Sequence, residues 1–118
     1  MNAAILVVDD EQNLVSLLEM VLTKRGYQVH AALTVEEAQN LIDRTAFDLA
    51  LIDIKIGPRD GLSLLEEIKK RRPDTKAIMI TAYPTRDTQL RSLQRGASAY
   101  FTKPLDLAAL LETIHGLV

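Results

Sequence analysis

Hydrophobic residues divide the chain into short continuous apolar runs and longer stretches in which they recur every three or four positions. Residues 5–8, 49–52 and 77–80 are apolar without alternation, which is typical of strands buried on both faces of a sheet. Residues 27–31 alternate between apolar and polar side chains, and residues 98–101 form a short mixed segment. These two segments favour edge strands. The pattern therefore predicts three interior strands and two edge strands.

The segments between the predicted strands carry apolar residues at the spacing of amphipathic helices. The sequence Thr34-Val35-Glu36-Glu37 is a capping box, Asp106 can cap the last helix, and Gly26 and Gly96 stand where helices end. Strand and helix thus alternate five times. The residues that set the helical spacing are Leu14, Leu18, Val21 and Leu22; Val35, Ala38, Leu41 and Ile42; Leu62, Leu65 and Ile68; Leu90 and Leu93; and Leu107, Leu110, Leu111 and Ile114.

This alternation predicts an α/β fold with a parallel sheet, right-handed crossovers and helices on both faces. With residues 27–31 and 98–101 at the edges, the strand order is 2-1-3-4-5, the doubly wound, flavodoxin-like arrangement of five strands. A chain of 118 residues suits one such domain, and it shows no linker or low-complexity stretch. We expect a single domain over residues 1–118.

Composition restricts the functions open to this domain. Fourteen Lys and Arg residues against 16 Asp and Glu give a net charge of −2, so direct nucleic-acid binding is not expected. The basic run at residues 69–72 ends a predicted helix, where cations complement the helix dipole. The absence of cysteine excludes disulfides, thiol nucleophiles and zinc–thiolate sites. Apolar runs of about six residues are far shorter than the roughly 20 of a membrane span, and no signal-peptide pattern is seen, so we expect a cytoplasmic protein without membrane contact.

Polar side chains follow four of the predicted strands. Asp9 and Asp10 follow the first strand, Asp53 ends the third, Thr81 ends the fourth and Lys103 follows the fifth. Ligands of open α/β sheets bind at the carboxyl ends of strands, where the strand order reverses, so we expect these residues to share one rim. Carboxylates about 4 Å apart repel by roughly 4 kcal/mol at an effective dielectric constant near 20. A retained proton, the Lys103 ammonium or a divalent cation must offset this, and an all-oxygen site with room for phosphate favours Mg²⁺.

Five short motifs at these strand ends, each weak alone, together form a specific pattern. They are Val7-Val8-Asp9-Asp10-Glu11, Asp53, Asp60-Gly61, Thr81-Ala82 and Tyr100-Phe101-Thr102-Lys103-Pro104. In this order the sequence resembles the receiver domain of two-component response regulators, over essentially its whole length. The resemblance implies that Asp53 accepts a phosphoryl group from a sensor histidine kinase or a phosphotransfer protein. It also implies that Asp9, Asp10, Asp53 and the backbone carbonyl of Lys55 hold Mg²⁺.

The resemblance further implies the parts of a switch. Lys103 would pair with one phosphoryl oxygen, Thr81 would hydrogen-bond another, and Tyr100 would be the aromatic residue that changes position. The Lys103-Pro104 peptide bond would be cis. The face made by the fourth predicted helix, the fifth strand and the fifth helix would then change for a partner, a C-terminal effector domain outside this chain or a second copy. Because the phosphoryl group is taken up and lost by the domain's own aspartate, no turnover of an external substrate is expected.

One loop departs from the family pattern. The family commonly has proline four residues after the phosphoacceptor, whereas Gly57 stands here and Pro58 follows, which leaves the loop conformation open. Lys55 and Tyr83 occupy positions that flank the phosphoryl group in the family. The bulk of these two side chains predicts a phosphoaspartate that hydrolyses slowly.

Each candidate residue also has a structural interpretation. Asp9 with Gln12 could cap a helix, Asp53 could close a turn, and Tyr100 could be an ordinary edge-strand residue. Thr81 could cap the following helix, although Thr85 is better placed beside a proline.

Three other functions compete with a phosphoacceptor. An aspartate-nucleophile phosphatase typically has a second aspartate where Lys55 stands, and a flavin carrier would need more aromatic residues and a phosphate-binding glycine loop. A constitutive scaffold would not require the full set of polar residues on the rim. His30 and His115 are predicted to lie far from the rim and are not expected to act as ligands or catalysts.

Overall fold

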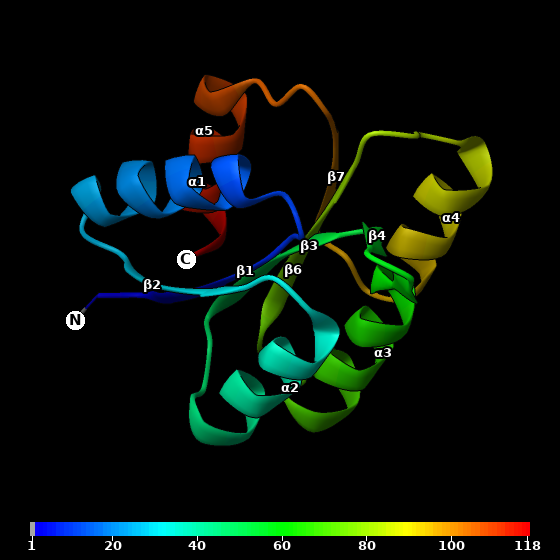
Figure 1. The fold of residues 1–118 in the computed structure, drawn as a ribbon, viewed down its shortest axis with the longest axis horizontal. Helices are drawn as coiled ribbons and strands as arrows, with labels where there is room; N and C mark the ends of the chain where they lie inside the picture. The colour runs from blue at the N-terminus through cyan, green and yellow to red at the C-terminus, as the bar shows by residue number, and fades with distance from the viewer. Residues whose placement is uncertain (1) are drawn as a thin grey trace.

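The computed structural model describes residues 2–118 and contains one parallel sheet with helices on both faces (Figure 1). The sheet pairs in the order β2-β1-β3-β6-β7, with every neighbouring pair parallel. This doubly wound order confirms the fold expected from the apolar pattern. Its strands are β1 (Ala4–Val8), β2 (Gln28–Ala32), β3 (Leu49–Asp53), β6 (Lys76–Thr81) and β7 (Ala99–Thr102).

Helices cover the two faces of the sheet unequally. Figure 1 shows α1 and α5 on one face and α2 and α3 on the other, with α4 beside the β7 edge. No helix within residues 2–118 has the length and apolar character needed to cross a membrane. The helices are α1 (Gln12–Lys24), α2 (Val35–Arg44), α3 (Gly61–Arg71), α4 (Arg86–Gln94) and α5 (Leu107–Leu117).

Side chains of the interior strands alternate between two apolar cores. In β1, Ile5 and Val7 join the core under α1 and α5, while Leu6 and Val8 join the core under α2 and α3. All residues of β1 and β3 are buried, whereas β2 and β7 are mostly half-buried, as expected for edge strands. Each fully buried aliphatic side chain contributes about 1.5–3 kcal/mol relative to an exposed one, so the two cores hold the strand ends in register.

The predicted helix ends are observed, except that the capping box at Thr34 forms only in part, because the Glu37 side chain accepts from the Leu33 amide instead of the Thr34 amide. Thr34 accepts a hydrogen bond from the Glu37 amide at the start of α2, and Asp106 accepts one from Ala109 at the start of α5. Gly26 and Gly96 have φ angles of 92° and 99°, a region that favours glycine, just after α1 and α4.

A small hairpin between β3 and α3 was not predicted. Its strands β4 (Lys55–Ile56) and β5 (Arg59–Asp60) pair antiparallel, and Gly57 and Pro58 form the turn between them. Strands of two residues are too short to show a periodic pattern, so the apolar residues predict only a loop in this segment.

Candidate functional site

The ends of the parallel strands bring the predicted polar residues together at one rim. Asp9 directly follows β1, Asp53 and Thr81 are the last residues of β3 and β6, and Lys103 directly follows β7. Side chains of Asp53, Thr81 and Lys103 line a cleft of about 330 Å³, together with Asp10, Lys55 and Tyr83. The expectation of a shared rim follows from the topology and agrees with this placement.

Three aspartate carboxylates lie close together at this rim. One oxygen from each of Asp9, Asp10 and Asp53 lies within 4.8 Å of the others, a grouping that could hold a metal ion. Asp9 and Asp53 are buried, with 2% and 6% of their surface exposed, whereas Asp10 is exposed. Burial of like charges costs free energy unless a cation or a proton compensates.

Lys103 supplies one compensating charge. Its Nζ lies 2.9 Å from Oδ2 of Asp53 and 2.9 Å from Oδ2 of Asp9. The contact with Asp53 is a hydrogen bond of good geometry. The contact with Asp9 is an ion pair by distance, but Asp9 Oδ2 is a buried oxygen that accepts no hydrogen bond within the described residues.

The pKa values of the pair reflect this crowding. Burial raises the pKa of Asp53 above its ordinary value, although hydrogen bonds from Lys103 and the Lys55 amide oppose the rise. Burial of Lys103 lowers its pKa, but the close contacts with the negatively charged Asp53 and Asp9 outweigh that effect and raise the pKa of Lys103 to about 12. The lysine is therefore a cation at neutral pH, while burial makes ionisation of Asp53 less favourable than that of an exposed aspartate.

The under-bonded oxygen of Asp9 fits a divalent cation. An all-oxygen donor set made of Asp9, Asp10 and Asp53 matches the preference of hard cations such as Mg²⁺. A cation in this group would give Asp9 Oδ2 the partner that Lys103 does not fully supply. The residues present thus fit a metal, and the carbonyl of Lys55, the first residue of the hairpin, belongs to the same predicted ligand set.

Local hydrogen bonds fix two of the carboxylates. Asp9 Oδ1 accepts from the Glu11 amide at 2.9 Å, and Asp53 Oδ1 accepts from the Lys55 amide at 3.1 Å. The N-cap of α1 is Glu11, so Asp9 is not the helix cap that its spacing to Gln12 allowed. Both aspartates do close local turns, and each keeps a second oxygen directed to the cleft partners described above.

The start of α3 approaches the backbone of Asp53 very closely. A Cβ atom built on Gly61 would lie 1.9 Å from the Asp53 carbonyl oxygen, a distance that no side chain can tolerate. The preceding Asp60 caps α3 by accepting a hydrogen bond from the Leu62 amide. The Asp60-Gly61 pair therefore lets the hairpin return close to the backbone of Asp53.

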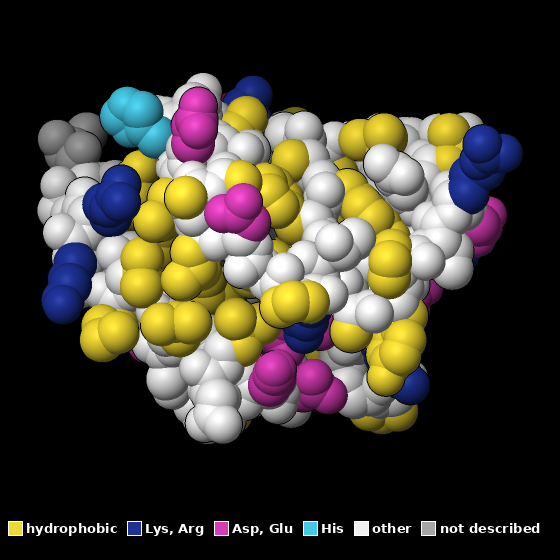
Figure 2. Space-filling model, turned by 90° about the horizontal axis from the view of Figure 1, so that it is seen from above, with side chains coloured by type: hydrophobic (Ala, Val, Ile, Leu, Met, Phe, Trp, Pro, Cys, Tyr) yellow, Lys and Arg dark blue, Asp and Glu magenta, His cyan; other side chains and the backbone are white. Residues whose placement is uncertain are grey.

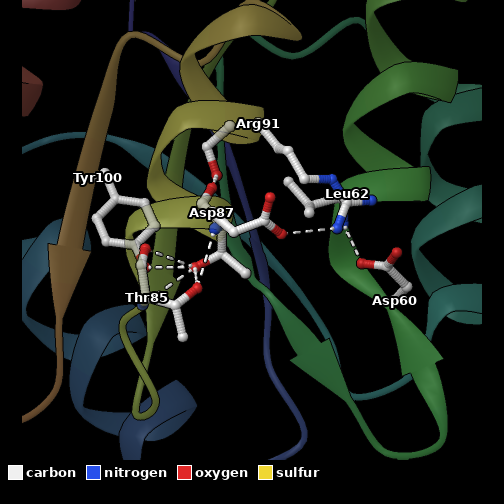
Figure 3. A network of polar contacts seen from close by, with 8 residues as sticks. Asp60, Leu62, Thr85, Asp87, Arg91 and Tyr100 are labelled. Atoms are coloured by element: carbon white, nitrogen blue, oxygen red, sulfur yellow. Dashed lines mark hydrogen bonds and ion pairs between the residues drawn. The ribbon is translucent and has the colours of Figure 1, made fainter.

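Thr81 and Tyr100 lie on neighbouring strands but have different partners. Thr81 is buried and its Oγ1 accepts from the Tyr83 amide at 3.0 Å, which leaves its hydroxyl proton available. Tyr100 is half-buried against the core under α2 and α3, and its hydroxyl lies 2.9 Å from Oγ1 of Thr88 in α4. Figure 3 shows the tyrosine ring pointing to the first turn of α4, where Thr88 also completes the capping box of Thr85.

Neither histidine lines the cleft, as the sequence predicts. His30 packs its ring edge-on against Phe47, with centroids 5.5 Å apart, and His115 lies near the end of α5.

The Lys103-Pro104 peptide bond is cis. The sequence does not predict two contacts near the site, that of Thr88 with Tyr100 and that of the Gly57 amide with Asp10. Each of them depends on a side-chain position that the tertiary structure sets.

A family model for the response regulator receiver domain matches residues 5–115. Response regulator protein PilR of Pseudomonas aeruginosa is 40% identical over 109 residues, which are 92% of this chain and 24% of PilR. The chain thus spans about a quarter of the length of this curated relative.

Solved structures give the same picture. A CheY-like receiver domain protein from Methanospirillum hungatei is 38% identical with a TM-score of 0.94, covering 98% of this chain and 93% of its own. A Burkholderia pseudomallei response regulator, described with a phosphorylated aspartic acid, calcium ion and citrate, is 29% identical with a TM-score of 0.88, covering 93% and 65%. The beryllofluoride-activated NtrC4 receiver domain dimer is 32% identical with a TM-score of 0.91, covering 97% and 94%.

Proposed function

The chain belongs to the response regulator receiver domain family, and from this premise we propose that Asp53 accepts a phosphoryl group from the phosphohistidine of a sensor kinase or phosphotransfer protein. The observation that carries the proposal is the group of three carboxylates within 4.8 Å beside Lys103, at the carboxyl ends of the strands. A purely structural rim would not bury two carboxylates and leave one of their oxygens without a hydrogen bond.

We propose Mg²⁺ as the cation that this site takes. Asp9, Asp10, Asp53 and the Lys55 carbonyl would hold it, as the fit of the donor set and the under-bonded Asp9 oxygen support. When bound, the ion supplies positive charge that offsets the carboxylates and the incoming phosphoryl oxygens. The calcium ion described for the Burkholderia pseudomallei relative supports a divalent cation in this family.

The chain's own residues account for the transfer. A carboxylate oxygen of Asp53 attacks phosphorus, and the phosphorus–nitrogen bond of the donor breaks with its electron pair going to the imidazole nitrogen. In-line phosphoryl transfer depends mainly on positioning and charge neutralisation. Lys103, already 2.9 Å from Asp53 Oδ2, is placed to follow the charge onto a phosphoryl oxygen, and the free hydroxyl proton of Thr81 can bond another.

The new charge then drives a change of shape. Moving a two-state equilibrium from 1:99 to 99:1 needs about 5.5 kcal/mol, and charge-assisted hydrogen bonds contribute about 1.5–3 kcal/mol each. Two such bonds, from Thr81 and from Lys103 to the phosphoryl group, would together supply about the free energy that this shift of the equilibrium requires. As Thr81 moves toward phosphate, the loop before α4 shifts, and the Tyr100 contact with Thr88 transmits the shift to the α4 face.

The domain acts on its own aspartate rather than on an external substrate. Loss of the phosphoryl group to water resets Asp53 and completes the cycle. The phosphatase alternative has no support at residue 55, because a lysine stands there. Sustained hydrolysis of ordinary phosphomonoesters would be the sign of that alternative.

Partners are inferred from two surfaces. Leu90 and Leu93 of α4 are half exposed, at 53% and 49%, and the NtrC4 dimer supports a homodimer through α4, β7 and α5.

In Figure 2 apolar side chains also gather where α1 and α5 lie. There, Leu14 and Leu17 line a groove of about 260 Å³ that shares Lys103 with the acidic cleft, so a phosphoryl donor that reaches Asp53 would cover it.

The match to a quarter of PilR supports an effector domain in a longer protein as the recipient of the signal. The cytoplasmic location stays a prediction.

Beryllofluoride, which mimics a phosphoryl group on aspartate, tests the proposal. With Mg²⁺ present it should shift the amide signals of Thr81, Tyr100 and α4 in the wild type, and leave those of Asp53→Asn unchanged. Spectra of the wild type in which Thr81, Tyr100 and α4 do not move would contradict the proposed switch.

A further inference from the structure

The hairpin between β3 and α3 contains a turn whose first central residue has a backbone conformation that favours glycine. Lys55 pairs with Asp60, and Ile56 pairs with Arg59, so Gly57 and Pro58 are the two central residues of the turn. Gly57 has a φ of 58°, whereas the ring of Pro58 fixes its φ near −65°. A positive φ at the first central residue only is the pattern of a type II′ hairpin turn.

This turn directs a backbone amide at one of the three carboxylates. The Gly57 N–H donates to Oδ2 of Asp10 at 2.8 Å, across 47 positions of sequence. Hydrogen bonds to charged acceptors are shorter and stronger than neutral ones, and 2.8 Å is a distance typical of them. Asp10 is exposed and is the outermost member of the carboxylate group, so without this bond its side chain would turn freely in water.

We infer that Gly57 is a positioning residue, whose amide holds the Asp10 carboxylate in the orientation from which it binds a divalent cation with Asp9 and Asp53. This inference rests on the proposed function, because it requires a cation at the rim. The bond uses one acceptor site of Asp10 Oδ2 and leaves the other acceptor sites of the carboxylate for the cation. Ligating carboxylates are commonly oriented in this way by hydrogen bonds from outside the metal's own ligands.

Backbone conformation, rather than the space around residue 57, favours glycine here. A Cβ atom on residue 57 would lie 4.0 Å from Asp10 Oδ2, an ordinary contact distance. A positive φ is nevertheless unfavourable for most side chains, and asparagine tolerates it best. Proline at residue 57 would remove the N–H and could not adopt the φ of 58°.

Matched variants at this turn distinguish the effect of losing the Gly57 N–H from the effect of changing the conformation of the loop. Gly57→Pro removes the donor, Gly57→Asn keeps the donor and tolerates the turn, and Pro58→Ala keeps the donor beside an altered turn residue. Dissociation constants for Mg²⁺ are measured on the unphosphorylated proteins by NMR titration, with folding checked from the same spectra. Loss of an orienting partner typically costs 10–100-fold in metal affinity, and for an exposed carboxylate we expect about tenfold in Gly57→Pro. Gly57→Asn and Pro58→Ala should stay within about twofold of the wild type.

A second measurement needs no metal. In the metal-free wild type, hydrogen exchange at the Gly57 amide should be protected, and Asp10→Ala should remove that protection.

Unchanged or tighter Mg²⁺ binding in a folded Gly57→Pro variant would overturn the inference while leaving the proposed function intact. Gly57 exchange that does not respond to Asp10→Ala would overturn it in the same way. A wild type that shows no saturable Mg²⁺ binding would refute both the inference and the metal role proposed above.

Discussion

Replacement of Lys103 with methionine removes the cation between Asp9 and Asp53 but keeps a side chain of similar length. Burial alone would lower the lysine pKa, yet the two carboxylates at 2.9 Å raise it from 10.5 to about 12. Because the folded-state pKa is higher than the unfolded one, charged Lys103 stabilises the fold fully below pH 10.5, and this is lost as the pH rises through about 12. At about 1.4 kcal/mol per pKa unit, the contribution at neutral pH is about 2 kcal/mol.

Urea unfolding followed by circular dichroism measures this loss. In EDTA at pH 7, Lys103→Met should lose about 2 kcal/mol of unfolding free energy, because Asp9 and Asp53 then face each other without a cation. Mg²⁺ should shrink the deficit, since it neutralises the same carboxylates. Lys70→Met is the matched control, because Lys70 is exposed on α3 and its replacement should change stability by less than about 0.5 kcal/mol. A Lys103→Met protein as stable as the control in EDTA would refute the reasoning.

Three further variants test other parts of the site. Burial raises the pKa of Asp53, so its ionisation destabilises the metal-free fold as the pH rises above 3.8. In EDTA, Asp53→Asn should therefore be more stable than the wild type at pH 7, and the difference should vanish near pH 3. Equal stability of the two proteins at pH 7 would contradict the claim that the buried charge of Asp53 destabilises the fold. Thr88→Val should lower stability by about 1 kcal/mol and shift the Tyr100 ring signals, because it removes the hydroxyl that contacts Tyr100; unmoved ring signals would show that this contact does not hold the ring. Lys55→Ala and Tyr83→Ala should each shorten the lifetime of the phosphoaspartate, measured by 31P NMR, because both side chains line the cleft that water must enter; an unchanged lifetime in both would eliminate their role.

The sheet could be predicted because burial leaves a direct trace in the sequence. Strands such as 49–52 are covered on both faces and must be apolar throughout, whereas the partly exposed β2 alternates. The strand order in turn requires the carboxyl ends of the parallel strands to lie at one edge of the sheet, so the sequence predicts that Asp9, Asp53 and Lys103 lie close together.

Other features could not be predicted because they depend on atomic positions. The two-residue strands β4 and β5 are too short for a periodic pattern, and the bond from Gly57 to Asp10 joins residues 47 positions apart. The spacing of Asp9 and Gln12 matched a capping box, but the chain places Glu11 at the N-cap and turns Asp9 into the cleft. Local spacing alone cannot separate these alternatives, since the same side chain satisfies either geometry.

Phosphorylation of Asp53 is tested most directly by intact mass spectrometry after incubation with acetyl phosphate and Mg²⁺. The wild type should gain about 80 Da, the mass of one phosphoryl group, while Asp53→Asn and an EDTA-treated wild type should gain nothing. A wild type that stays unmodified, or an Asp53→Asn protein that gains the same mass, would contradict the assignment of Asp53 as the phosphoacceptor.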